Sequence, residues 1–149
     1  MTPAFSRVWD KSLAKSTDWL RELAADLGWD DPHLALQALR SVLHALRDRL
    51  PPDEAADLAS QLPSLIKGVY FDGWDPSATP VKYRTAEEFL AVVRRPFHGG
   101  PLVSETERVT RAVFTLLARH VTAGEIGDVR GSLPAELAEL WPAGLSGRA

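Results

Sequence analysis

Residues 36–50 carry the pattern that most constrains what this chain can fold into. Apolar side chains recur there at spacings of three and four, which is the repeat of one face of an α-helix. Asp31-Pro32 precedes the run, and aspartate caps free helix amides while proline suits the first helical turn. Pro51-Pro52 follows the run and ends the helix. The sequence therefore predicts an amphipathic helix of about five turns, and we expect it at the centre of the first half.

Similar start and stop signals divide the rest of the chain into helices. Helices are predicted over residues 9–27, 53–60, 63–68, 86–95, 104–121, 122–130 and 134–141. Gly28 suits the left-handed cap at the end of the first of them. Capping boxes are expected at Thr85–Glu88, Ser104–Glu107 and Thr122–Glu125, where they satisfy free amides at helix starts. The fold class predicted from these signals is all-α, and the tail after Pro142 is expected to fray.

One segment departs from the helical pattern. Residues 69–84 contain two prolines, a glycine and a concentration of aromatic side chains. Prolines and glycines at this density favour turns and loops. We therefore expect a long aromatic connection, with short extended pieces around Tyr70 and Val81.

Composition excludes several classes of protein. The chain has 149 residues, 45% apolar and 25% charged, which is typical of one globular domain. It has no cysteine, which excludes disulfides, thiol catalysis and thiolate zinc sites. The formal net charge is −3 with both signs interspersed, which is unlike a general nucleic-acid binder. No apolar stretch resembles a signal peptide or a membrane span, so we expect a cytoplasmic protein without membrane contact, and no cofactor.

The two halves of the chain resemble each other at an offset of 71 residues, the separation of Arg40 and Arg111. Other matched pairs are Val42 with Val113, Leu46 with Leu117, Glu54 with Glu125, Asp57 with Asp128, and Leu62-Pro63 with Leu133-Pro134. We predict an internal duplication, with helical units at residues 1–75 and 76–149 that pack as one body. The core is expected to contain Leu39, Val42, Leu43, Leu46, Leu62, Ile66, Val113, Leu117, Leu133 and Leu137.

Several longer motifs resemble a known bacterial family. The motifs are LHALRDRL (43–50), AADLASQLP (55–63), KGVYFDGW (67–74), PVKYRTAEEFL (80–90) and AGEIGDVRGSLPAELAELW (123–141). Together they resemble the family known as domain of unknown function 2267, over roughly residues 10–142. The resemblance implies a duplicated all-helical fold, and it assigns no activity and no catalytic residue.

His44, Arg47 and Asp48 form the first candidate site, a predicted ligand cleft. They lie three and four residues apart, so they share one face of the predicted central helix. A His–Asp pair can perform acid–base chemistry, because the carboxylate orients and polarises the imidazole. No nucleophile or oxyanion-hole motif accompanies the pair. The alternative is structural, with Arg47, Asp48 and Arg49 making ion pairs and helix-end contacts between the halves.

Tyr70, Phe71, Trp74 and Tyr83 form the second candidate site, a predicted interaction surface on the aromatic connection. Exposed tryptophan and tyrosine are strong interface anchors, because they bury much area at little cost in entropy. The alternative is that Tyr70 and Trp74 fold back and cover the core. The match of Tyr70 with Trp141 in the repeat favours that alternative.

Two further kinds of site have less support. His44 and His120 lie near matching places in the repeat, and two histidines with a carboxylate would suit zinc. The four histidines show no recognised ligand spacing, however, so no metal is expected. The short helices 53–60 and 63–68 suggest a helix-turn-helix, but Lys67 is the only basic residue of the second.

The function expected from these patterns is a non-enzymatic module that binds another protein. The alternative is a small-ligand binder or enzyme that uses His44 and Asp48 in the cleft between the units, and nucleic-acid binding is the third. An exposed apolar patch around Trp74 would favour a protein partner. A concave pocket containing His44 with a shifted pKa would favour a ligand, and a contiguous basic face would favour nucleic acid. The oligomeric state is left open.

Overall fold

The computed structural model describes residues 3–143 and confirms the all-α fold class, with no strand among them. Its helices are α1 (Pro3–Ser6), α2 (Asp10–Leu27), α3 (Pro32–Arg49), α4 (Pro52–Ala59), α5 (Ser64–Phe71), α6 (Ala86–Arg94), α7 (Pro101–Ser104), α8 (Thr106–His120), α9 (Ala123–Gly131) and α10 (Ala135–Ala138). Two short 3₁₀ turns complete it, η1 (Arg7–Trp9) and η2 (Pro76–Ala78). The predicted frayed tail lies mostly outside the described residues.

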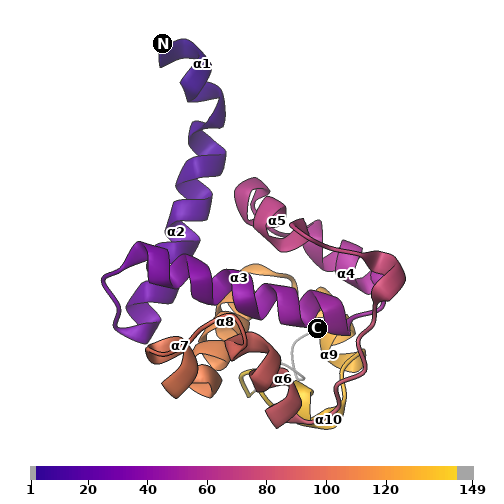
Figure 1. The fold of residues 1–149 in the computed structure, drawn as a ribbon. Coiled ribbons are helices and arrows are strands. Elements are labelled where there is room, and N and C mark those ends of the chain that lie inside the picture. The colour runs from indigo at the N-terminus through magenta and orange to yellow at the C-terminus, as the bar shows by residue number, and fades with distance from the viewer. Residues whose placement is uncertain (1–2, 144–149) are drawn as a thin grey trace.

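The helix α3 runs through the middle of the molecule. It packs against α2, α5, α6 and α8, so that α4 and α5 lie on one side of it and α6 and α8 on the other (Figure 1). The side chain of Asp31 caps its start by accepting hydrogen bonds from the amides of His33 at 2.9 Å and Leu34 at 3.3 Å. Leu50 is extended and ends it. The predicted central helix is therefore confirmed.

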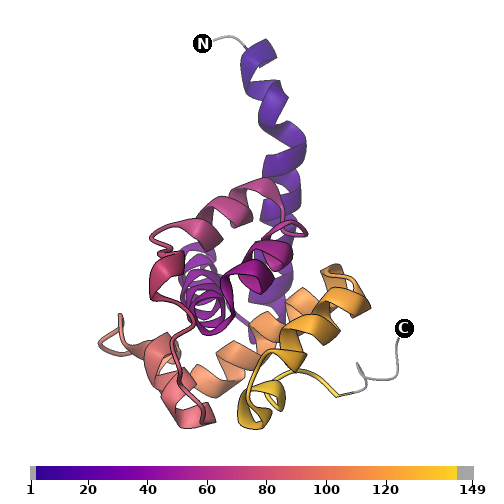
Figure 2. The same ribbon diagram turned by 90° about the vertical axis from the view of Figure 1, so that its right-hand side faces the viewer.

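The helix α2 is anchored at one end and free at the other. Trp19, Leu23 and Leu27 of its second half are buried, and Gly28 ends it in the left-handed conformation with φ of 72°. Towards the N-terminus, α2 continues through η1 and α1 without a break. This end stands clear of the other helices in both views of the ribbon (Figures 1 and 2). No helix in residues 3–143 has both the length and the hydrophobicity that crossing a bilayer requires.

One hydrophobic core joins the two halves of the chain. All ten residues predicted for the core are buried, and one cluster contains side chains from both halves. The boundary between residues 75 and 76 and the duplication itself stay predictions. Matched positions nevertheless have similar backbone angles: Pro63 has φ −58° and ψ 150°, and Pro134 has φ −59° and ψ 155°.

The predicted extended piece around Tyr70 is wrong, because α5 continues through it to Phe71. The Tyr70 side chain is buried, and its hydroxyl donates to the carbonyl of Ala55 at 2.8 Å. This tertiary contact fixes the last turn of α5 in the core. The segment that follows, up to Thr85, is non-helical except for η2, and it contains Val81.

The three predicted capping boxes have different outcomes. Thr85 and Glu88 form a complete capping box, with reciprocal bonds of 3.1 Å. Thr122 accepts from the amide of Glu125 at 3.3 Å, but no return bond from the Glu125 carboxyl is present within the described residues.

The third prediction, at Ser104–Glu107, is wrong. Pro101 starts a separate turn, α7, which takes in Ser104, and the Ser104 hydroxyl donates to the carbonyl of Gly100 at 3.2 Å. Glu107 instead forms an ion pair with Arg111.

Candidate functional site

A cavity of about 410 Å³ opens beside α3 and contains the predicted site residues His44 and Asp48. The imidazole of His44 is half-buried, and its Nε2 lies 2.7 Å from the carbonyl oxygen of Val69. Because a carbonyl can only accept, Nε2 carries the proton and Nδ1 is left as an acceptor. Burial lowers the pKa of His44, which favours the neutral ring.

Arg47 lies in the core, although it was predicted to share the cleft. Only 4% of it is exposed, and it does not line the cavity. Its guanidinium donates to the carbonyls of Tyr70 at 2.8 Å and Asp72 at 2.9 Å, at the end of α5. Its Nε donates to the carboxylate of Asp48 at 2.8 Å. Arg47 thus makes helix-end contacts, but within the first predicted unit and not between the halves; Arg49, which donates to the carbonyl of Tyr83 at 2.8 Å, reaches the second unit. No hydrogen bond joins His44 to Asp48 in the described part of the chain.

Arg95 lines the same cavity and was missed by sequence reasoning. It also lines a neighbouring cavity of about 560 Å³, so the two form one groove along α6. Arg95 is exposed, and within residues 3–143 its guanidinium has no hydrogen bond or ion pair. Val92 and Phe97 give the groove an apolar wall. An unpaired guanidinium beside apolar side chains suits a small anion with an apolar body.

The predicted aromatic surface does not exist as an exposed patch. Tyr70 and Tyr83 are buried, and the hydroxyl of Tyr83 donates to the carbonyl of Ala45. Phe71 and Trp74 are half-buried, and their ring centroids lie 5.2 Å apart. The prediction is therefore wrong for the two tyrosines, because their polar ends find backbone partners inside the core.

The largest exposed apolar side chains cluster instead on the free end of the α1–η1–α2 segment. Phe5 is 76% exposed, Val8 71%, Trp9 67% and Leu13 55%. We call these four residues the N-terminal stripe. The sequence signal was present, since Trp9 and Leu13 continue the helical spacing of the buried face of α2. Helical spacing alone does not reveal that the rest of the protein leaves Trp9 and Leu13 uncovered.

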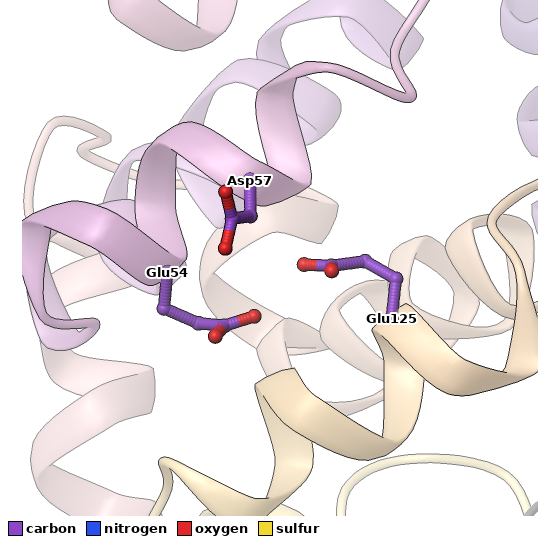
Figure 3. A group of neighbouring side chains, drawn as sticks. All are labelled: Glu54, Asp57 and Glu125. Atoms are coloured by element: carbon purple, nitrogen blue, oxygen red, sulfur yellow. The ribbon is translucent and has the colours of Figure 1, made fainter.

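Three carboxylates meet where α4 packs against α9. Glu54 and Asp57 come from α4 and Glu125 from α9, and all three point toward one another (Figure 3). One oxygen from each lies within 4.8 Å of the others, a spacing at which they could hold a cation. One oxygen of Glu54 and one of Glu125 are buried and lack a hydrogen-bond partner among the described residues. Burial, with Glu54 and Asp57 nearby, raises the pKa of Glu125 to about 8.

The predicted pair of histidines has different surroundings at each ring. His120 stacks on Trp19, with ring centroids 4.7 Å apart, and its Nε2 lies 2.7 Å from a carboxylate oxygen of Glu22. His44 is bound to the carbonyl of Val69. The contacts of the two rings therefore give no support to a shared zinc site.

Replacing Glu125 with glutamine is expected to flatten the pH dependence of stability. The pKa of Glu125 is about 8 in the folded protein and 4.5 for the free group. The folded state therefore binds more protons between these values, and the free energy of unfolding falls as pH rises through this range. Glutamine is neutral at every pH, so Glu125→Gln should gain about 1 kcal/mol over wild type near pH 9, allowing for solvent screening.

Urea denaturation across this pH range measures the effect. Glu139→Gln is the matched control, because Glu139 is exposed and its carboxylate has no ion pair in residues 3–143. Equal pH slopes for wild type and Glu125→Gln would contradict the raised pKa.

Comparison with known proteins identifies a family but no activity. No curated protein matches the chain. A family model described as an uncharacterized conserved protein, DUF2267, matches residues 16–140. The matched region includes the cavity, the acidic cluster and the core except Trp141, whereas the N-terminal stripe lies before it. Because the match covers most of the 149 residues, the chain belongs to the DUF2267 family of uncharacterized conserved proteins.

Proposed function

We propose that this protein is a non-enzymatic interaction module, and that it binds a protein partner through the N-terminal stripe. The observation that carries the proposal is the exposure of Phe5, Val8, Trp9 and Leu13 on a helix that projects from the body. Scattered exposed apolar residues are ordinary, but a contiguous apolar face of this kind is typical of a contact surface. The absence of cysteine fits a cytoplasmic location for this binding.

The energetics of the projecting segment support this function. A helix of fewer than about 12–15 residues is marginally stable in water without tertiary packing. The segment before Leu13 has no buried side chain among those described. A partner that covers the stripe would stabilise the helix and remove apolar surface from water, at about 1.5–3 kcal/mol per large side chain. Phe5 and Trp9 have the size and rigidity of interface anchors.

The test is partner capture from native lysate by wild type and by Leu13→Glu. Leu13 is 55% exposed, so the charge should leave the fold intact while it disrupts an apolar interface. We expect at least about a tenfold loss of a specific bound protein. The matched control is Val81→Glu, an exposed valine on the connection, with circular dichroism confirming that all three proteins fold. Equal capture by wild type and Leu13→Glu would reject the stripe as the binding surface.

A second candidate function, small-ligand binding, is favoured by the groove at His44 and Arg95. Its cavity volume of about 410 Å³ lies within the usual range for ligand pockets. The neutral His44 ring offers an acceptor, and Arg95 offers an unpaired positive charge. The Arg95 charge and the apolar wall match a small carboxylate with an aromatic or aliphatic body, and the His44 Nδ1 acceptor suits a hydroxyl or N–H donor on that body. The Ser41 hydroxyl lines the same cavity but donates to the carbonyl of Val93 at 2.6 Å, which favours binding over catalysis.

Titration with benzoate and hexanoate tests this second candidate. We expect ring proton shifts of His44 in NMR spectra, and about tenfold weaker binding for Arg95→Gln, since the charged partner of the carboxylate is lost. Arg84→Gln, a neutral substitution of another exposed arginine, should bind as wild type does. Absence of shifts at His44, or unchanged affinity in Arg95→Gln, would exclude this use of the groove.

A further inference from the structure

We propose that the partner of the N-terminal stripe is a second copy of this chain, and that the two α2 helices pack antiparallel. The inference rests on the proposed function, because it takes the stripe to be an interface. It goes further, because it names the binding partner and the alignment of the two helices.

The second half of α2 offers a groove of suitable shape. A cavity of about 470 Å³ is lined there by Leu20, Arg21, Ala24, Ala25 and Trp29. The small side chains of the two alanines leave room for a large one. Phe5 and Trp9 are the large exposed side chains at the other end of the same segment.

Helical spacing places Trp9 and Leu13, the last two residues of the stripe, in one row with residues of the groove, beside the buried face of α2. Trp9, Leu13, Thr17, Leu20 and Ala24 follow one another at steps of four, four, three and four. The aromatic half of this row and its alanine half are complementary in shape. In a pair of copies, each aromatic half packs against the alanine half of the other copy only when the two helices run in opposite directions. Such an isologous contact closes on itself and forms a dimer.

A single register brings these features together. When Leu13 lies opposite Thr17 of the second copy, Trp9 lies opposite Leu20 and Arg21, and Phe5 opposite Ala25. Each large side chain then enters a hole between residues of the facing helix, as in antiparallel helix packing. The two-fold axis repeats every contact.

The charges along α2 favour the same register. Asp10 is exposed and has no ion pair within residues 3–143, and Arg21 has only an exposed contact with Asp18 at 3.8 Å. In the antiparallel register, Asp10 of each copy lies beside Arg21 of the other. A parallel pair would place Asp10 beside Asp10 and Arg21 beside Arg21. Opposite charges at an interface edge set orientation more than affinity, so these pairs select the antiparallel arrangement.

Sedimentation velocity of the full chain over a range of concentrations tests the proposal. We expect a reversible dimer for wild type. Asp10→Arg and Arg21→Asp should each raise the dimer Kd about tenfold, because each places like charges together twice across the axis. The double variant should return Kd to within about threefold of wild type, since it restores both pairs. Arg84→Asp is the control for charge reversal away from α2, and circular dichroism checks every variant for folding.

Two results would overturn the proposal: a wild-type monomer at every concentration, or a dimer whose charge reversals are not rescued in the double variant. Leu13→Glu separates failure of this inference from failure of the proposed function. If wild type is monomeric and Leu13→Glu still loses a specific protein in the capture experiment, the stripe is an interface for a different partner. If neither dimer nor capture depends on Leu13, both proposals fail.

Discussion

The burial of α3 among four other helices is the constraint on which the rest of the structure depends. α3 carries Arg47 and Arg49 in its last turn, and both are buried. A buried guanidinium is costly unless its donors are bonded. Arg47 therefore binds the carbonyls of Tyr70 and Asp72, and Arg49 binds the carbonyl of Tyr83. These bonds hold both ends of the aromatic connection against α3, so two charged side chains direct the path of a segment that lacks regular structure.

The same constraint explains why the predicted cleft residues separate. Side chains three and four residues apart share one face of a helix. When several helices pack around that helix, side chains on the same face contact different neighbours. Arg47 faces the end of α5, whereas His44 and Asp48 border the groove beside α6. Arg95 lines the groove from the end of α6, so residues far apart in the chain line one cavity. No local pattern in the sequence predicts that Arg95 lines the same cavity as His44 and Asp48.

Prediction succeeded where a short stretch of sequence determines the structure. The α3 helix, its Asp31 cap and the Thr85–Glu88 capping box depend on residues within one or two turns. The Ser104 cap failed because Pro101 offered a competing start three residues earlier. Tyr70 was expected in a loop because of the prolines and glycine after it, but its hydroxyl contact with Ala55 lies 15 residues away in sequence. The N-terminal stripe shows the same limit, because periodicity identifies an apolar face without showing what covers it.

The central claim is that the stripe on the projecting end of α2 is an interface between two copies of this chain rather than an uncovered extension of the core face. Hydrogen–deuterium exchange of the amides in residues 4–16, measured from dilute to concentrated protein, tests it most directly. An interface between copies predicts exchange that slows as concentration rises, with the same change around Ala24 and Ala25. Fast exchange in residues 4–16 at every concentration, with no change around the two alanines, would contradict the account.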